Sequence, residues 1–202
     1  MIEIKNLNKA YGKHSIFQDF SLCIRGGEIA VISGESGAGK TTLLNIIGAL
    51  EPFDGGQVVV NGIDVNNPRN HRKYFAEQVG FLFQNFVLIE ELSVRKNLEF
   101  VRKANASVIP IEEALRRVGL LDKIDSKVYT LSGGEQQRVA LARLMIKKCN
   151  IILADEPTGS LDRKNADHVL SILESLNAEG KTVLIVTHDM SIKTRGWRMI
   201  DL

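Results

Sequence analysis

Eight consecutive residues that follow a short apolar run have the spacing of a phosphate-binding loop. They read Gly34-Glu35-Ser36-Gly37-Ala38-Gly39-Lys40-Thr41 and match the pattern G-x-x-x-x-G-K-[ST] in full. Glycines let the backbone curl around an anion, and a helix beginning near Lys40 offers free N–H groups and a positive dipole end. We expect Lys40 to reach the β- and γ-phosphates of a nucleotide, Thr41 to coordinate Mg²⁺, and Thr42 to bond the α-phosphate. The alternative is a glycine-rich turn that carries a lysine by chance, and the complete pattern with both flanks disfavours it.

A second candidate group is an acidic pair at the end of an apolar run, Ile151-Ile152-Leu153-Ala154-Asp155-Glu156. In open α/β sheets ligands bind beyond the carboxyl ends of the strands, so Asp155 should lie near the phosphate loop. There it can hold Mg²⁺ directly or through water, while Glu156 orients or deprotonates an attacking water. Taken alone, the pair fits a solvated loop equally well. Beside a complete phosphate loop, the site interpretation is favoured.

A third segment, Leu131-Ser132-Gly133-Gly134-Glu135-Gln136-Gln137-Arg138, has the features of a helix start. Ser132 and Glu135 fit a capping box. The two glycines weaken a helix by roughly 0.5–1 kcal/mol each relative to alanine, and they make sense if a phosphate must approach the backbone closely. The capping box alone favours an ordinary capped helix start.

The elements that must position these groups alternate between strands and helices. We expect strands at residues 2–4, 20–24, 29–33, 57–60, 151–154 and 182–186. We expect helices over residues 40–50, 112–118 and 165–177, with another beginning near Gly133 and a mostly helical segment from about Phe86 to Thr130. The short apolar strands lack polar alternation, which is typical of burial on both faces. The pattern therefore predicts an α/β fold with a largely parallel sheet.

Length and composition fit an ordinary globular protein of one domain. The chain has 202 residues, 44% hydrophobic and 25% charged, with a formal net charge of +2. No run of five or six like charges occurs, so no broad nucleic-acid surface is indicated. Cys23 and Cys149 lack metal-ligand spacing, and we expect both to be buried, reduced thiols. The sequence shows no signal peptide and no apolar stretch long enough to span a bilayer.

With these motifs in this order, the sequence resembles the ABC ATPase family over essentially its whole length. The segment from Leu131 to Gln137 is similar to the family's signature motif. The resemblance implies a P-loop NTPase fold of the ABC type: a RecA-like, mainly parallel sheet core with an N-terminal antiparallel β subdomain and an α-helical subdomain. It also implies a single domain over residues 1–202, in which residues 86–130 are the helical subdomain and residues 1–85 and 131–202 form the ATP-binding core.

The resemblance also assigns roles to further residues. Tyr11 is similar to the aromatic residue that stacks on adenine, and Gln84 to the glutamine that senses Mg²⁺ and the membrane partner. Asp162, in Pro157-Thr158-Gly159-Ser160-Leu161-Asp162, resembles the carboxylate of the loop after the acidic pair, and His188 resembles the switch histidine at the γ-phosphate. In this family the signature loop faces the phosphate loop of a second copy. The resemblance therefore implies that Ser132, Gly133, Gly134, Glu135 and Gln137 act in trans, in a homodimer formed on ATP binding.

Three kinds of ABC ATPase remain open. The first is a transporter subunit, the second a membrane-coupled regulator that transmits force, and the third a soluble ATPase of translation or DNA repair, which the single motif set disfavours. Finer segments, such as Leu43 to Gly48 and Gly80 to Phe86, resemble small bacterial ATPases of lipoprotein release, macrolide or peptide efflux, and cell division. We therefore expect an integral membrane permease as partner, peripheral attachment at the cytoplasmic face of the membrane, and export of a peptide, bacteriocin or antibiotic.

Some features depart from the family pattern without removing a catalytic group. Cys149-Asn150 stands before the acidic strand, where Asn-Pro is common in the family, and residues 194–197 lead unusually into the final strand. The chain ends at Leu202, so we expect no accessory regulatory domain. The apolar residues Phe86, Val87, Leu88 and Ile89 fit either a partner-binding surface or the core.

Overall fold

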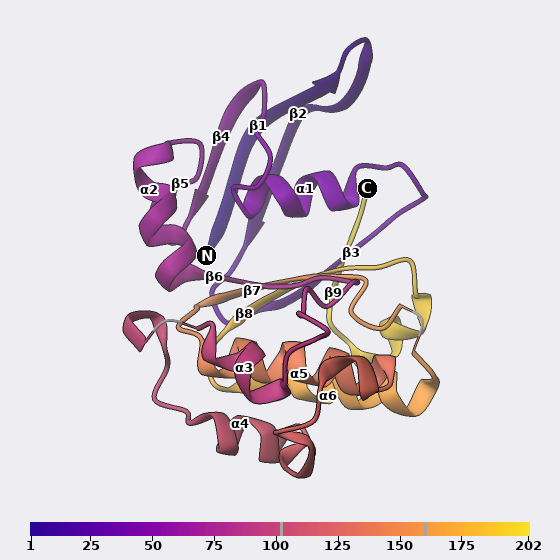
Figure 1. The fold of residues 1–202 in the computed structure, drawn as a ribbon. Helices are drawn as coiled ribbons and strands as arrows, with labels where there is room; N and C mark the ends of the chain where they lie inside the picture. Colours follow the sequence, from indigo (N-terminus) through magenta and orange to yellow (C-terminus); the bar gives the residue numbers. More distant parts are fainter. Residues whose placement is uncertain (102, 160) are drawn as a thin grey trace.

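A five-stranded parallel sheet crosses the middle of the molecule, seen edge-on in Figure 1. The chain is described here by a computed structural model that covers residues 1–101, 103–159 and 161–202. The strand order is β6-β7-β8-β3-β9, and every pairing is parallel. The strands are β3 (Ile29–Ser33), β6 (Val79–Leu82), β7 (Ile151–Asp155), β8 (Thr182–Val186) and β9 (Arg198–Asp201). Strands β3 and β8 are buried along their whole length, which explains their continuous apolar sequences.

A four-stranded antiparallel sheet forms the upper layer in Figure 1, with the order β2-β1-β4-β5. Its strands are β1 (Ile2–Tyr11), β2 (His14–Ile24), β4 (Gly55–Val60) and β5 (Ile63–Asp64). The first two strands are longer than the sequence pattern predicted. Asn6 and Asp19 have positive φ angles of 48° and 49°, and the register between the strands shifts at several points. These irregularities break the period-two alternation on which the prediction rested.

Helix α1 (Lys40–Ile47) lies between the two sheets, whereas α5 (Gly133–Ile146) and α6 (Arg163–Ala178) cover the opposite face of the parallel sheet (Figure 1). The remaining α-helices are α2 (Pro68–Lys73), α3 (Val94–Glu99) and α4 (Ile111–Arg117). The sequence predicted α1 to reach residue 50. It ends at Ile47 because Gly48 caps it and Ala49 has a φ angle of 56°, outside the helical region.

The segment from residue 86 to residue 130 contains helices, as the sequence predicted, but each of them is short. Besides α3 and α4 they include 3₁₀ turns at Lys103–Asn105, Leu121–Lys123 and Val128–Thr130. A π-helical turn (Tyr74–Gln78) and a 3₁₀ segment (Met190–Arg195) lie elsewhere in the chain. The core interpretation of the apolar run at 86–89 holds for two residues, and the partner-binding interpretation stays a prediction. Phe86 and Leu88 pack against the core, while Val87 and Ile89 are about half exposed.

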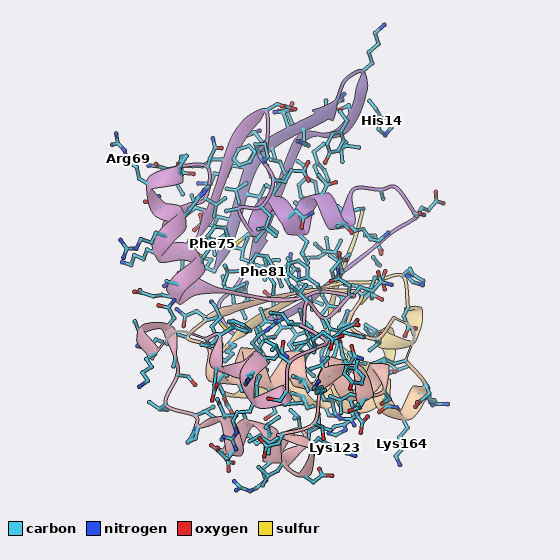
Figure 2. All side chains as sticks on the ribbon, viewed as in Figure 1. His14, Arg69, Phe75, Phe81, Lys123 and Lys164 are labelled. Carbon is cyan, nitrogen blue, oxygen red and sulfur yellow. The ribbon has the colours of Figure 1, made fainter. Side chains whose placement is uncertain are left out.

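Two hydrophobic cores flank the parallel sheet. One joins α1 and the antiparallel sheet to the upper face of the parallel sheet, and the other joins α3 to α6 to its lower face. Figure 2 shows side chains filling both spaces, with His14 at the outer tip of the β1–β2 hairpin and Lys123 among the helices on the other side. The architecture confirms the predicted α/β class with a parallel core, an antiparallel β subdomain and a helical segment.

The two cysteines differ in exposure. Cys149 is buried as predicted, and burial raises the pKa of its thiol. The prediction for Cys23 was wrong, because this residue is exposed. On β2, Leu22 and Ile24 turn inward and leave Cys23 on the outer side of the strand. Among the described residues, no helix is both long enough and apolar enough to cross a membrane.

Candidate functional site

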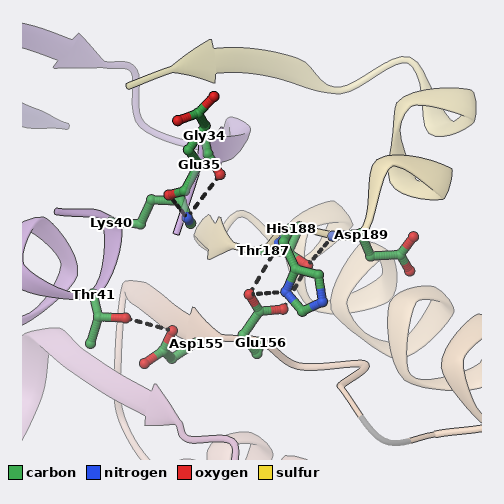
Figure 3. Close-up of polar contacts among 9 residues, drawn as sticks. All are labelled: Gly34, Glu35, Lys40, Thr41, Asp155, Glu156, Thr187, His188 and Asp189. Carbon is green, nitrogen blue, oxygen red and sulfur yellow. Dashed lines mark hydrogen bonds and ion pairs between the residues drawn. The ribbon is translucent and has the colours of Figure 1, made fainter. Parts of the chain in front are cut away.

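Three adjacent strands of the parallel sheet deliver the polar groups of the site. Strands β7, β8 and β3 are neighbours, and their carboxyl ends carry the acidic pair, the Thr187-His188 segment and the phosphate loop respectively. Backbone bonds tie these ends together, since Glu156 N–H donates to Val186 and Thr187 N–H donates to Ile32. The side chains gather at one edge of the sheet (Figure 3). This edge is where open α/β sheets bind ligands.

The phosphate loop is curled around its own lysine. The Lys40 ammonium donates to the carbonyl oxygens of Gly34 at 2.9 Å and Glu35 at 2.7 Å (Figure 3). Gly39 caps α1 with a φ angle of 91°, and a Cβ there would lie 2.5 Å from Ile16 Cγ2. Glycine is therefore required at this position by both the backbone and its neighbour. Helix α1 begins at Lys40 directly after the loop, and the first N–H groups of a helix lack intrahelical partners, as an anion site needs.

Thr41 and Asp155 bring two oxygen ligands together below the loop. Thr41 Oγ1 donates to Asp155 Oδ1 at 3.4 Å, a long hydrogen bond. Burial raises the pKa of Asp155, and the neighbouring Glu156 charge adds to the rise. The hydrogen bond from Thr41 and the charge of Lys40 act in the opposite direction. A cation placed between these oxygens would relieve a carboxylate that its surroundings disfavour.

The Glu156 carboxylate is held by the two residues that follow β8. Oε1 accepts from the backbone N–H of His188 at 3.1 Å and lies 2.7 Å from His188 Nδ1, while Oε2 accepts from the Thr187 hydroxyl at 2.9 Å (Figure 3). Glu156 itself has a φ angle of 45°, which is uncommon for a residue other than glycine. Such backbone strain is concentrated at functional sites.

An open pocket of about 570 Å³ lies over these groups. Its lining includes most of the predicted phosphate-binding residues together with Glu156 and His188. Two further lining residues, Ile16 and Val186, were not predicted, because their apolar types carry no chemical signal in the sequence. Together the lining residues are Ile16, Ser36, Gly37, Gly39, Lys40, Thr41, Thr42, Glu156, Val186 and His188.

Tyr11 and Gln84 are among the predicted residues that lie outside this lining, as are Gly34, Glu35, Ala38 and Asp155. Tyr11 stands at the end of β1 with its hydroxyl hydrogen-bonded to Glu51, and the Lys9 ammonium lies 4.6 Å from its ring centroid. The structure thus does not bring Tyr11 to the pocket. Gln84 lies in the loop after β6, with its amide nitrogen 3.5 Å from where a Cβ on Gly159 would stand. It therefore neighbours the turn that follows Glu156.

The signature turn is a capped helix start outside the pocket. Ser132 Oγ accepts from Glu135 N–H at 3.3 Å, and the Glu135 carboxylate accepts from Ser132 N–H at 2.8 Å. Gly133 is exposed, and a Cβ there would meet nothing closer than 4.0 Å. A Cβ on Gly134 would lie 2.9 Å from Asn165 Cγ, so packing against α6 already requires that glycine. Both glycines were predicted to allow the close approach of a phosphate. Packing already explains Gly134, so the phosphate explanation now concerns Gly133 alone.

Gln137 is one of the residues that the resemblance assigns to the signature motif acting in trans. It is 1% exposed, and its amide donates to the Pro157 carbonyl at 2.8 Å inside the chain. Asp162 is exposed and caps α6, accepting from Asn165 N–H at 3.0 Å. Asn165 in turn accepts from Arg138 at 2.7 Å, so α5 and the loop after Glu156 are joined through side chains. Ser160 of that loop lies outside the described residues.

The fold and the loop together define a P-loop nucleotide-binding protein: a parallel sheet with a glycine-rich loop after β3, a helix start beneath it and an acidic pair on a nearby strand. A family model described as ABC transporter matches residues 17–159. The chain belongs to this family. Family membership and the ATP-binding relatives identify it as an ATPase.

Relatives with different printed names match the chain at similar levels. The macrolide export ATP-binding/permease protein MacB of Campylobacter jejuni subsp. jejuni serotype O:23/36 (strain 81-176) is 40% identical over 100% of this chain and 33% of its own length. The glutamine transport ATP-binding protein GlnQ of Escherichia coli (strain K12) is 39% identical over 94% of this chain and 82% of its own length. The chain therefore spans about a third of the MacB relative.

A solved structure with the same fold is a dimer of the ATP-binding cassette MJ0796 in a post-hydrolysis state bound to ADP and Pi. It is 36% identical, with a TM-score of 0.85, and the match covers 100% of this chain and 94% of that chain. The predicted P-loop fold of the ABC type is thereby confirmed.

Proposed function

We propose that two copies of this chain pair head to tail around ATP, hydrolyse it and drive an integral membrane permease. The observation that carries the proposal is the position of the signature turn. Among the described residues, none from 131 to 137 lines the phosphate pocket of its own chain, although Ser132 and Gly133 are exposed at a helix start. A helix N-terminus favours an anion. A second copy's nucleotide would supply one, and the dimeric MJ0796 relative supports this arrangement.

Lys40, Thr41 and Asp155 would bind the triphosphate and its metal. Lys40 exchanges the Gly34 and Glu35 carbonyls for phosphate oxygens, a stronger charge-assisted interaction. The hydroxyl and carboxylate oxygens of Thr41 and Asp155 are ligand types that Mg²⁺ prefers. Among proteins that act on nucleotides, Mg²⁺ typically keeps several waters and is held by one or two protein side chains together with the phosphates. Bound Mg²⁺ would neutralise charge that develops on the phosphates.

Glu156 would act as the base for the attacking water, with His188 as the switch at the γ-phosphate and Gln84 as the sensor beside the Glu156–Gly159 turn. His188 Nδ1 and Glu156 Oε1 are 2.7 Å apart, so the two side chains are already coupled. When His188 turns to the phosphate, Oε1 becomes available to a water. Signature residues Ser132, Gly133 and Gly134 of the second copy would close the site, with Asp162 of the adjoining loop at the same interface.

The membrane partner would bind an aromatic groove between the sheet and the helical segment 86–130, which we take as one subdomain of a single ATPase domain. The groove has a volume of about 390 Å³ and includes Phe81, Phe83, Phe100 and Arg143. Phe100 is 60% exposed, and the rings of Phe81 and Phe83 are stacked. A short helix with an apolar face and an acidic residue fits this surface. Attachment there would hold the chain at the cytoplasmic face of the membrane.

We propose export of a peptide, bacteriocin or antibiotic as the work that this ATPase drives. The MacB relatives, named for macrolide export, match 100% of this chain and support it. The relatives named for methionine import and glutamine transport make import the competing direction.

The pairing is tested with Glu156→Gln, which should retain ATP, stop turnover and accumulate an ATP-bound dimer on size-exclusion chromatography. Adding Gly133→Glu to this variant should abolish the dimer, because a carboxylate would then face the partner's phosphates. Apart from its own helix, no described residue lies closer than 4.0 Å to a Cβ at this position, so the fold and ATP binding by the monomer should persist.

Gly26→Glu is the matched control, since Gly26 is also exposed and precedes β3 at the opposite edge of the sheet. The double variant with Gly26→Glu should still form the dimer. A Gly133→Glu double variant that dimerises as well as its parent would exclude the proposed pairing. Wild-type turnover by Glu156→Gln would exclude Glu156 as the base.

A further inference from the structure

The carboxylate of Glu156 is held by two residues that use different oxygens. His188 contacts Oε1 through both its backbone N–H and its ring, whereas Thr187 alone contacts Oε2 among the described residues. The two contacts also differ in environment. The His188 side chain is 76% exposed, while Thr187 is 1% exposed. One contact can therefore open to solvent or ligand while the other stays enclosed.

The hydroxyl proton of Thr187 has a defined direction. Thr187 Oγ1 accepts the backbone N–H of Asp189 at 3.0 Å and lies 2.9 Å from Glu156 Oε2. A hydroxyl has one proton and two lone pairs, so it can accept the N–H and donate its own proton to the carboxylate. A β-branched side chain has restricted χ1 freedom, and the Thr187 backbone N–H is bonded to Ile32 of β3. The donor is therefore fixed to the sheet.

We propose that Thr187 is a positioning residue that keeps the Glu156 carboxylate aligned for the attacking water. The inference rests on the proposed function of Glu156 as the base. The His188 ring contacts Glu156 Oε1 in this structure and leaves it when it turns to the γ-phosphate, while the His188 backbone N–H stays on that oxygen. Thr187 is then the side-chain donor that remains on the carboxylate, on Oε2, and without it the carboxylate can rotate about the backbone contact, away from the geometry that proton transfer needs.

Two substitutions of Thr187 distinguish the contribution of its hydroxyl group from that of its methyl group. Thr187→Val keeps the shape of the buried side chain and loses the donor, whereas Thr187→Ser keeps the donor and loses the methyl group. Steady-state ATP hydrolysis at saturating Mg²⁺ and protein should show kcat of Thr187→Val reduced about 10- to 100-fold, the range for a misplaced catalytic group. KM for ATP should stay within about twofold, because Thr187 does not line the phosphate pocket. Thr187→Ser should retain most of the wild-type kcat.

A role in packing alone predicts the opposite order, with the valine variant active and the serine variant impaired. Thermal unfolding of both variants, with folded fractions measured at the assay temperature, separates lost activity from lost protein. Wild-type kcat in Thr187→Val, or an equal loss in both variants, would overturn the inference. If the Thr187 variants give one of these two outcomes while Glu156→Gln is inactive in the same assay, the role of Thr187 is excluded and Glu156 remains the proposed base. Wild-type turnover by Glu156→Gln removes both.

Discussion

At the scale of single residues, the two glycines of the signature turn have different reasons to be glycine. Gly134 is buried beneath Asn165, whose side chain is fixed by Arg138 and Asp162. Gly133 faces open space. Sequence inspection treats the pair alike, because the neighbour that distinguishes them comes from α6, about 30 positions further along the chain.

Gly134→Ala should therefore destabilise the nucleotide-free chain by about 1–3 kcal/mol, the usual range for overpacking. The new methyl group would displace Asn165 and weaken its bonds to Arg138 and Asp162. Gly133→Ala, as the paired control, should be neutral or slightly stabilising, since alanine favours a helix. Urea unfolding of the three proteins measures the difference. Equal stability of Gly134→Ala and wild type would contradict the packing assignment.

Some features of the candidate site could be predicted from short segments of the sequence, and others could not. The phosphate loop and the acidic pair were predictable, because each motif is contiguous and its chemistry depends on a short backbone segment. The contacts of Tyr11 and Gln137 could not be predicted, because they are made with residues far away in the sequence, and the roles assigned to these two residues stay predictions. Glu51 holds the Tyr11 hydroxyl, and Pro157 holds the Gln137 amide. Thr187 had a usable signal, as a hydroxyl between a buried strand and a candidate site histidine.

At the scale of elements, helix α5 begins with reciprocal capping by Ser132 and Glu135. The backbone hydrogen bond from Ser132 is the main reason why the pKa of Glu135 lies below its ordinary value of 4.5. A lowered folded-state pKa means that the contribution to stability is present above pH 4.5 and is lost as pH falls through the folded-state value. Stability at this helix start is therefore acid-sensitive.

Glu135→Gln should reduce the free energy of unfolding by about 0.3–1 kcal/mol at neutral pH, since it removes a negative charge from a helix N-terminus. The difference in the free energy of unfolding between this variant and the wild type should shrink towards zero as the pH falls below 4.5 and Glu135 of the wild type becomes protonated. Urea unfolding at a series of pH values gives the comparison. Glu91→Gln is the control, since Glu91 is exposed and has no hydrogen bond or ion pair within the described residues. A difference that grows on acidification would mean that the carboxylate is not stabilising.

Strand prediction succeeded where burial is uniform and failed where the backbone is irregular. Strands β3, β7 and β8 pass through the centre of the parallel sheet, so their sequences are apolar except for Ser33, Asp155 and Thr182 at their ends. Helix α2 and strands β5 and β6 were not predicted as elements, because α2 has no buried residue, β5 has only two residues, and Gly80 interrupts the apolar run of β6. Short or fully exposed elements leave no periodic pattern from which to predict them.

At the scale of the whole molecule, the open pocket and the exposed signature turn predict activity that depends on pairing. Turnover per chain at saturating ATP should rise with protein concentration and then level off, because each site is completed by mass action with a second copy. Phosphate release measured over a wide range of protein concentrations tests this. The turnover per chain of the Gly133→Glu variant should stay low at every protein concentration in this range. A constant specific rate in the wild type would mean that one chain forms a complete site.

Arg143, near the C-terminal end of helix α5, connects this helix to the aromatic groove. Its guanidinium holds the carbonyls of Phe86 and Val87 beside the aromatic groove, and Ser132 lies at the other end of the same 14-residue helix. At 1.5 Å per residue the two ends are about 20 Å apart. Because a continuous helix resists compression along its axis, we expect that a displacement at the groove would also shift the Ser132 turn.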